Sequence, residues 1–251
     1  MTGSAGRGAA QFETGIAREE AGFAVTLNGA PAKTPGRHPL IVPGAALARE
    51  IAKEIKDVIA DQPGALSGKG KGAQIAAPNF RIAAGAIDVI THERGARDRV
   101  VADLSGYGAT DLVCFRCSHP DALVAAQAAA WAPLTDWFAA EFGASLSVTS
   151  GLAAPDHDPR ALAAIAAAVG AADDFTLAAL SLATRSAGSV VIGLALARGR
   201  IDAAEAFAAA TVDEIYQAER WGADEEASRG REATALDLRQ AAQFLELLAE
   251  G

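Results

Sequence analysis

The chain contains 251 residues, and its 22 lysines and arginines against 31 aspartates and glutamates give a formal net charge of −9 and an isoelectric point near 5.0. This length fits one large domain or two small ones, and either can bury a substantial core. An acidic chain without a block of Lys and Arg lacks the basic stripe by which proteins bind nucleic acid. It also lacks the cationic amphipathic helix that holds a protein on an anionic membrane, so we expect no nucleic-acid partner and no stable membrane association.

The N-terminal part of the chain has the pattern of a small antiparallel sheet. Phe23–Leu27 is typical of a short strand, and Asn28-Gly29 is the dipeptide of a type I′ hairpin turn. Residues 30–34 can return as the second strand, and Pro39–Val42 extends once more. From Ala45 onward the apolar residues recur every three and four positions, which predicts a helix after the sheet.

Two segments offer little to bury. Residues 1–15 have no apolar core, which predicts a polar tail rather than a secretory signal. Residues 62–77 contain Gly68-Lys69-Gly70-Lys71-Gly72, which invites comparison with a phosphate-binding loop. The segment has neither the spacing of G-x-x-x-x-G-K-[ST] nor its hydroxyl residue, so a solvated loop is favoured.

The middle of the chain carries both cysteines. We expect Asn79 to cap a helix, a short helix near Asp98–Tyr107, and a strand at Asp111–Cys117. On a strand, side chains three residues apart point to opposite faces, so Cys114 and Cys117 would neither form a disulfide nor share a metal. The four histidines are scattered along the chain, and no metal site is expected.

The C-terminal half predicts mainly helices. Phe175–Arg198 is apolar on nearly every side, as expected of one buried central helix, and Gly188 and Gly193 within it suggest close approach of a neighbouring backbone. Asp202-Ala-Ala-Glu205 has the spacing of a capping box, and the helix that it opens should continue to Trp221.

These elements predict a division of the chain after residue 118. Apart from a short strand expected at Ser145–Thr149, every element after that point is helical. We therefore expect an α+β fold. A small N-terminal domain with an antiparallel β-sheet plus helices would span residues 1–118, and a mainly α-helical C-terminal domain would span residues 119–251.

The best candidate for a catalytic site is Asp156-His157-Asp158. A histidine between carboxylates can serve as a base or a ligand, so one hypothesis is a small-molecule enzyme with acid/base chemistry at these residues. However, Asp158 followed by Pro159 already has the pattern of a helix cap. The chain also has no G-x-S-x-G nucleophile elbow and no G-x-G-x-x-G turn, so we expect no enzyme and no cofactor.

A second candidate lies near the C-terminus, where residues 212–222 read Val-Asp-Glu-Ile-Tyr-Gln-Ala-Glu-Arg-Trp-Gly. An acidic helix interleaved with aromatic residues suits a protein partner, because Trp and Tyr are favoured anchors of interfaces. The alternative is that Tyr216 and Trp221 pack inward and the acidic side chains are merely solvated.

The same residues contribute to a family resemblance. Three stretches carry it in order along the chain: Gly22–Gly29 with Thr34-Pro35, Pro39–Pro43 and Leu47-Ala48; Thr110–Arg116 with Gln127, Trp131, Pro133-Leu134 and Trp137; and Ser186–Val191 with Asp213-Glu214, Gln217 and Trp221-Gly222. On these residues the chain resembles the Atp12 family, the assembly chaperones of the F1 part of ATP synthase. It departs from the family pattern at Ile55, at residues 77–80 and at Ala132.

The resemblance implies an ATP-independent chaperone that binds the F1 α subunit of ATP synthase and prevents its aggregation before it meets β. It also implies the division into a sheet-containing domain and a helical domain. The partner-binding residues are expected to be Asp213, Glu214, Gln217, Glu219 and Trp221. The absence of an Arg-rich transit segment favours the bacterial cytoplasm over the mitochondrial matrix. The alternatives are the enzyme centred on His157 and a helical scaffold for another partner.

Overall fold

A computed structural model describes residues 12–61, 77–151, 153–222 and 224–251. Residues 1–11 of the predicted polar tail and residues 62–76 of the predicted loop therefore lie outside the described residues, whereas β1 begins at Thr14, within the predicted tail. The chain divides into two compact units, residues 1–88 with 247–251 and residues 89–246. This division falls well before the predicted boundary at residue 118, because helix α3 (Ala96–Gly106) packs against helices of the second unit.

The first unit contains an antiparallel sheet, as the sequence predicts. Its strands, in the order β1-β2-β3 with β4 also paired to β2, are β1 (Thr14–Glu19), β2 (Gly22–Leu27), β3 (Ala30–Pro31) and β4 (Ile41–Val42). Asn28 and Gly29 join β2 to β3 with φ angles of 50° and 78°, the positive values that a type I′ turn requires. Only glycine fits at position 22, because the methyl group of even an alanine would overlap the Val42 carbonyl oxygen.

Helix α1 (Ala45–Asp61) packs on β1 and β2 through its apolar side, which buries Leu47, Ile51 and Ile55. The next helix, α2 (Pro78–Gly85), is not capped by Asn79 as predicted. Instead, the Glu54 carboxylate of α1 accepts hydrogen bonds from the backbone N–H groups of Asn79 and Phe80, at 3.2 and 3.0 Å. A carboxylate from a neighbouring helix thus supplies the cap.

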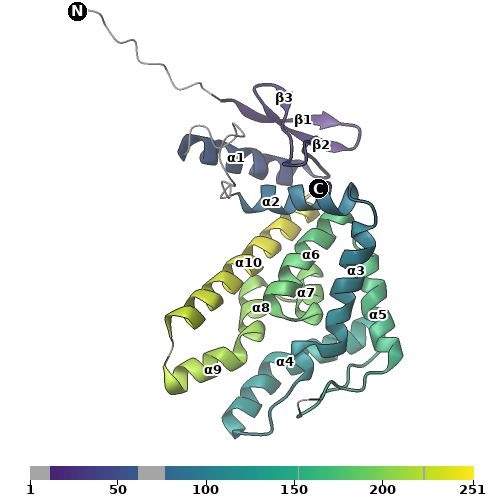
Figure 1. The fold of residues 1–251 in the computed structure, drawn as a ribbon, viewed down its shortest axis with the longest axis vertical. Coiled ribbons are helices and arrows are strands. Elements are labelled where there is room, and N and C mark those ends of the chain that lie inside the picture. Colours follow the sequence, from purple (N-terminus) through teal and green to yellow (C-terminus); the bar gives the residue numbers. More distant parts are fainter. Residues whose placement is uncertain (1–11, 62–76, 152, 223) are drawn as a thin grey trace, which may run out of the picture. The chain divides into compact units, whose positions relative to one another are not determined.

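The second unit is helical. Its elements after the π-helical turn η1 (Ala86–Thr91) and α3 are η2 (Tyr107–Thr110), η3 (Leu112–Cys114), α4 (Asp121–Phe142), α5 (Pro159–Gly170), α6 (Asp174–Ala187), α7 (Val190–Ala197), α8 (Ala203–Ala210), α9 (Val212–Trp221) and α10 (Glu225–Ala249). Helix α7 contacts α4, α5, α6 and α8 and is buried over most of its length (Figure 1). The predicted α+β class, with a small sheet followed by helices, is confirmed.

The two strands predicted at Asp111–Cys117 and Ser145–Thr149 are wrong. Within Asp111–Cys117, Leu112–Cys114 forms the 3₁₀ turn η3, because the Asp111 carboxylate accepts a hydrogen bond from the Val113 N–H and closes a turn. Of the two expected strands, only a single bridge between Phe115 and Thr149 remains.

The predicted helix over Phe175–Arg198 is two helices that meet at a sharp turn. Gly188 ends α6 with φ 66°, and the Ser189 hydroxyl caps α7 by accepting a hydrogen bond from the Ile192 N–H at 3.0 Å. Gly193 lies against α6, where a methyl group would overlap the Thr184 hydroxyl. Close approach therefore explains Gly193, whereas Gly188 is required by the turn.

Two helix starts follow the sequence pattern. The Asp158 side chain caps α5, and Asp202 with Glu205 forms a complete capping box at the start of α8. The helix from Asp202 does not run unbroken to Trp221, since Thr211 separates α8 from α9.

Candidate functional site

Helix α9 has no fully buried residue, and one of its sides faces solvent. The side chains of Glu214, Gln217, Glu219, Arg220 and Trp221 are exposed, and we call the four of them other than Arg220 the α9 surface. Trp221 is 77% exposed, the highest value among the exposed large apolar side chains of the described residues. The two aromatic residues thus differ: Tyr216 is partly buried, with Arg220 5.0 Å from its ring centre, whereas Trp221 points outward.

Asp213, the fifth predicted residue, has a structural partner. Its carboxylate accepts a hydrogen bond from the Gln127 side-chain N–H at 2.7 Å, and the Gln127 side-chain oxygen Oε1 accepts one from the Cys117 N–H at 2.7 Å. Gln127 is 3% exposed, so this chain of bonds fixes α9 on α4 from within. Asp213 therefore holds the helix in place.

Two further side chains support α9 indirectly, and sequence reasoning gave them no role. The Trp131 indole N–H donates to the Ala209 carbonyl oxygen at 2.7 Å, and Trp131 is completely buried. Arg116 lies 5.1 Å above the Trp131 ring and donates to the backbone carbonyl oxygen of Gln127 at 3.0 Å. Because Ala209 lies in the last turn of α8, these contacts fix the end of the helix that leads into α9.

Asp111 is a second acidic position, and it is completely buried. Its carboxylate accepts hydrogen bonds from the Ser189 hydroxyl at 2.6 Å, from the Val191 N–H at 3.1 Å and from the Val113 N–H at 3.2 Å. Burial raises the pKa of Asp111 to about 6, and these hydrogen bonds oppose the shift. The Asp111 carboxylate joins η3 to the start of α7. Because it is completely buried, it is not exposed to a ligand in solution.

The residues Asp156, His157 and Asp158 do not converge on an acid/base site. The buried His157 accepts a hydrogen bond from the Ser147 N–H through Nδ1 at 3.1 Å, and burial lowers the pKa of its imidazole. The Asp158 carboxylate accepts from the Arg160 N–H at 2.9 Å as the cap of α5, and Asp156 accepts from the Ser147 hydroxyl through its backbone carbonyl at 2.7 Å. Each residue thus has a local structural role.

Comparison with known proteins identifies the family. The family model of the ATP12 chaperone protein matches residues 10–139. The crystal structure of Atp12 from Paracoccus denitrificans is 40% identical to this chain and covers 94% of it and 95% of its own length, with a TM-score of 0.84. A mutant of that protein gives the same values. A candidate chaperone from Agrobacterium tumefaciens is 35% identical, covers 94% of this chain and 84% of its own, and has a TM-score of 0.80.

This chain belongs to the ATP12 chaperone family. The predicted family is therefore confirmed, and membership assigns the chain a chaperone role. In this ATP12 family member, several residues that carried the resemblance have structural roles. Gly22 lies in the sheet, and Asp111, Gln127 and Trp131 lie in the helical unit. The Ser186 hydroxyl donates a hydrogen bond to the Asp237 carboxylate at 2.7 Å.

The cysteines of this ATP12 family member are both free thiols. Cys114 is buried, and burial raises the pKa of its thiol to about 12, so the reactive thiolate is suppressed. Within the described residues, no three His, Cys, Asp or Glu side chains are grouped as a metal ion would require.

A helix that crosses a membrane must be long enough and apolar enough to span the hydrocarbon core. None of the described helices of this ATP12 family member has both that length and that apolar character.

Proposed function

We propose that this chain is an ATP-independent assembly chaperone, which binds the F1 α subunit of ATP synthase and prevents its aggregation until it meets the β subunit. Membership of the ATP12 chaperone family supports the proposal. The observation that carries it is Trp221, which is 77% exposed on a helix that also exposes the acidic side chains of Glu214 and Glu219. Tryptophan is among the commonest hot-spot residues of protein interfaces.

The chemistry of the α9 surface suits a chaperone that must release its client. An unassembled subunit exposes a large apolar interface that otherwise aggregates. A chaperone without a fuel needs an affinity low enough for the β subunit to displace it. One exposed indole ring supplies apolar contact, and the solvated carboxylates of Glu214 and Glu219 on the same helix limit the total affinity, since their desolvation on binding opposes association.

We assign Glu214, Gln217, Glu219 and Trp221 to client contact and Asp213 to the positioning of α9. We further propose that the protein works in the bacterial cytoplasm, without a cofactor or metal and without nucleic acid. The bacterial sources of both similar structures support this location. The lack of a G-x-x-x-x-G-K-[ST] segment in the sequence supports the independence from ATP.

Purified F1 α subunit tests the proposal directly. We expect the chain to form a complex with α in calorimetry and to suppress the light scattering of α that is diluted without β, equally well with and without ATP. The variant Glu214→Lys should weaken the complex about tenfold or more, because it reverses a charge at the interface. The matched control is Glu20→Lys, which makes the same change at an exposed position of the first unit.

Equal binding by Glu214→Lys and the wild type, with unchanged circular dichroism, would remove α9 from the proposal. Failure of the wild type to bind α or to suppress its aggregation would overturn the function itself.

A further inference from the structure

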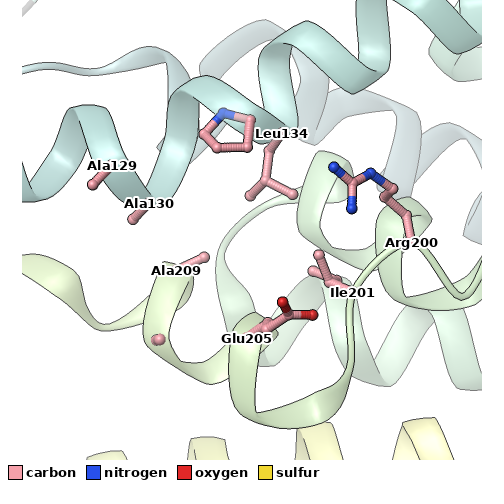
Figure 2. Close-up of a pocket in the computed structure, with 9 residues that line it drawn as sticks. Ala129, Ala130, Leu134, Arg200, Ile201, Glu205 and Ala209 are labelled. Carbon is pink, nitrogen blue, oxygen red and sulfur yellow. The ribbon is translucent and has the colours of Figure 1, made fainter.

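An open pocket of about 280 Å³ lies between α4 and α8 (Figure 2). Its walls are mostly small and apolar, with Ala129 and Pro133 from α4, Ala208 from α8 and Ile201 from the connection before α8. Alanines on the facing sides of two packed helices leave this hollow, because their side chains are too short to fill the space between the backbones.

Two charged side chains lie at one end of this pocket, and one of them already has a hydrogen-bond partner. Figure 2 shows the Arg200 guanidinium and the Glu205 carboxylate near Ile201. The Glu205 carboxylate accepts a hydrogen bond from the Asp202 N–H at 2.9 Å within the capping box. In the described ranges of the chain, the Arg200 guanidinium makes no hydrogen bond or ion pair. The pocket thus offers an apolar floor and one unpaired cation.

The size and lining of the pocket favour a side chain over a small metabolite. Its volume is below the roughly 300–1,000 Å³ that is typical of small-molecule sites. Its lining contains no histidine, cysteine, serine or tyrosine, so it provides no nucleophile and no proton shuttle at neutral pH. A hollow of this size accepts one large aliphatic or aromatic side chain.

We propose that this pocket binds an apolar side chain of the client polypeptide, on a segment whose neighbouring acidic residue pairs with Arg200. The inference rests on the proposed function and adds a second contact to the α9 surface. A carboxylate is the complementary group because Arg200 is unpaired at the mouth of the pocket.

The pocket and the α9 surface share the same support. Ala209, which lines the pocket, belongs to the last turn of α8, and α9 begins shortly afterwards at Val212. The Trp131 indole bonds to the Ala209 carbonyl oxygen, and α4 contacts both α8 and α9. A client segment that reaches α9 can therefore reach a preformed pocket on the same packed helices, with little cost in ordering the chaperone.

Filling the pocket tests the apolar contact. Ala129→Phe and Ala208→Phe each place a ring where the client side chain would sit, and both alanines are exposed positions on helices. We expect each variant to weaken binding of purified F1 α subunit between about tenfold and a hundredfold, the value of burying one large apolar side chain.

The controls make the same substitution outside the pocket. Ala128→Phe lies next to Ala129 on α4, and Ala204→Phe lies one turn before Ala208 on α8, where it lines a different and more open groove. Both controls should bind α as the wild type does. Unchanged affinity of the two pocket variants, or an equal loss in the controls, would overturn the inference.

Charge substitutions test the acidic neighbour. Arg200→Glu should weaken binding of α about tenfold, whereas Arg200→Lys should retain most of it, because the attraction is to a carboxylate. Arg81→Glu, an exposed arginine of the first unit, is the matched control. Tighter binding by Arg200→Glu would mean that the occupant is basic and would contradict the proposal.

The same measurements separate the two proposals. Normal binding of α by the wild type and by all pocket variants, with a loss only in Glu214→Lys, would overturn the pocket and leave the proposed function standing. No binding of α by the wild type would overturn both.

Discussion

Asp111 and the outward side of α9 both place acidic side chains at the start of a helix, yet their surroundings are opposite. Asp111 is completely buried at the start of α7 and accepts hydrogen bonds from Ser189, Val191 and Val113. Glu214, in the first turn of α9, is exposed. An acid near a helix N-terminus is favourable in both settings, so the location alone does not distinguish a structural residue from a binding residue.

The surroundings do distinguish them. Three donors converge on Asp111 and no solvent reaches it, so any change there leaves buried polar groups without partners. Within the described residues, the Glu214 and Trp221 side chains have no such partners, so they can change without a penalty in folding. The residues of the family resemblance therefore divide into a group that holds the fold and a group that remains free to bind.

The largest expected effect is the loss of the buried carboxylate. Asp111→Ala should lower the free energy of unfolding by roughly 3–5 kcal/mol, because the Ser189 hydroxyl and two backbone N–H groups lose their acceptor inside the core. Urea denaturation followed by circular dichroism measures the change. Asp98→Ala, at an exposed position of α3, should change the same quantity by less than about 0.5 kcal/mol. Similar losses in both variants would remove the distinction between buried and exposed acids.

The pH dependence of stability tests the same site. The pKa of Asp111 is raised from 3.8 to about 6 in the folded state, so between these values the folded chain holds a proton that the unfolded chain has released. The free energy of unfolding should therefore fall as the pH rises from about 4 to about 6, and this site should add no further change above that range. The change in the pKa of Asp111 from 3.8 to about 6 corresponds to a loss of at most about 3 kcal/mol in the free energy of unfolding.

Asp111→Asn isolates this contribution, because it keeps the shape of the side chain but does not titrate. The difference in unfolding free energy between the wild type and the variant should follow the predicted slope, while the contributions of Asp88 and Glu54 cancel. A difference that is constant between pH 4 and pH 7 would show that Asp111 has an ordinary pKa.

Much of the fold could be predicted from local patterns. The Asn28-Gly29 turn, the Asp158 cap and the capping box at Asp202 each depend on residues within a few positions of one another, and all three are present. The strand predicted at Asp111–Cys117 failed because its apolar residues fit a strand and a buried turn equally well. The partners of Asp111, Ser189 and Val191, lie too far along the chain for a local pattern to reveal them.

The candidate site was predicted less completely, for the same reason. The sequence marked residues 212–222 as acidic and aromatic, but it could not decide whether Trp221 points inward or outward, since that depends on the packing of α9 on α4. Nor could it reveal that Asp213 bonds to Gln127, which a local pattern does not connect to it. Alanine-rich stretches on α4 and α8 gave no sign of the pocket between them, because alanine is equally common on solvated and packed helix sides.

Truncation of the exposed indole should affect binding and leave stability unchanged. Trp221→Ala should weaken the complex with the F1 α subunit by about 2 kcal/mol, or roughly 30-fold, if the ring is an interface anchor. Its effect on the free energy of unfolding should stay within about 0.5 kcal/mol, because the side chain is 77% exposed. Leu236→Ala, which removes another exposed apolar side chain on α10, should alter neither quantity. A large loss of stability in Trp221→Ala would place the ring in the structural group.

The smallest effect separates two adjacent acids of α9. Asp213→Ala removes the acceptor of the Gln127 amide and should lower the free energy of unfolding by about 1–2 kcal/mol. Glu214→Ala should leave that quantity unchanged within about 0.5 kcal/mol but weaken binding of α. Denaturation and calorimetry on both variants give four values, and the expected pattern is a loss of stability only for Asp213 and a direct loss of affinity for Glu214.

If the affinity of Asp213→Ala falls as well, Asn at position 213 should restore it, because the amide oxygen can still accept from Gln127 and hold α9 in place. Failure of Asp213→Asn to restore binding would mean that the Asp213 charge itself meets the client, and Asp213 would then belong to the binding group.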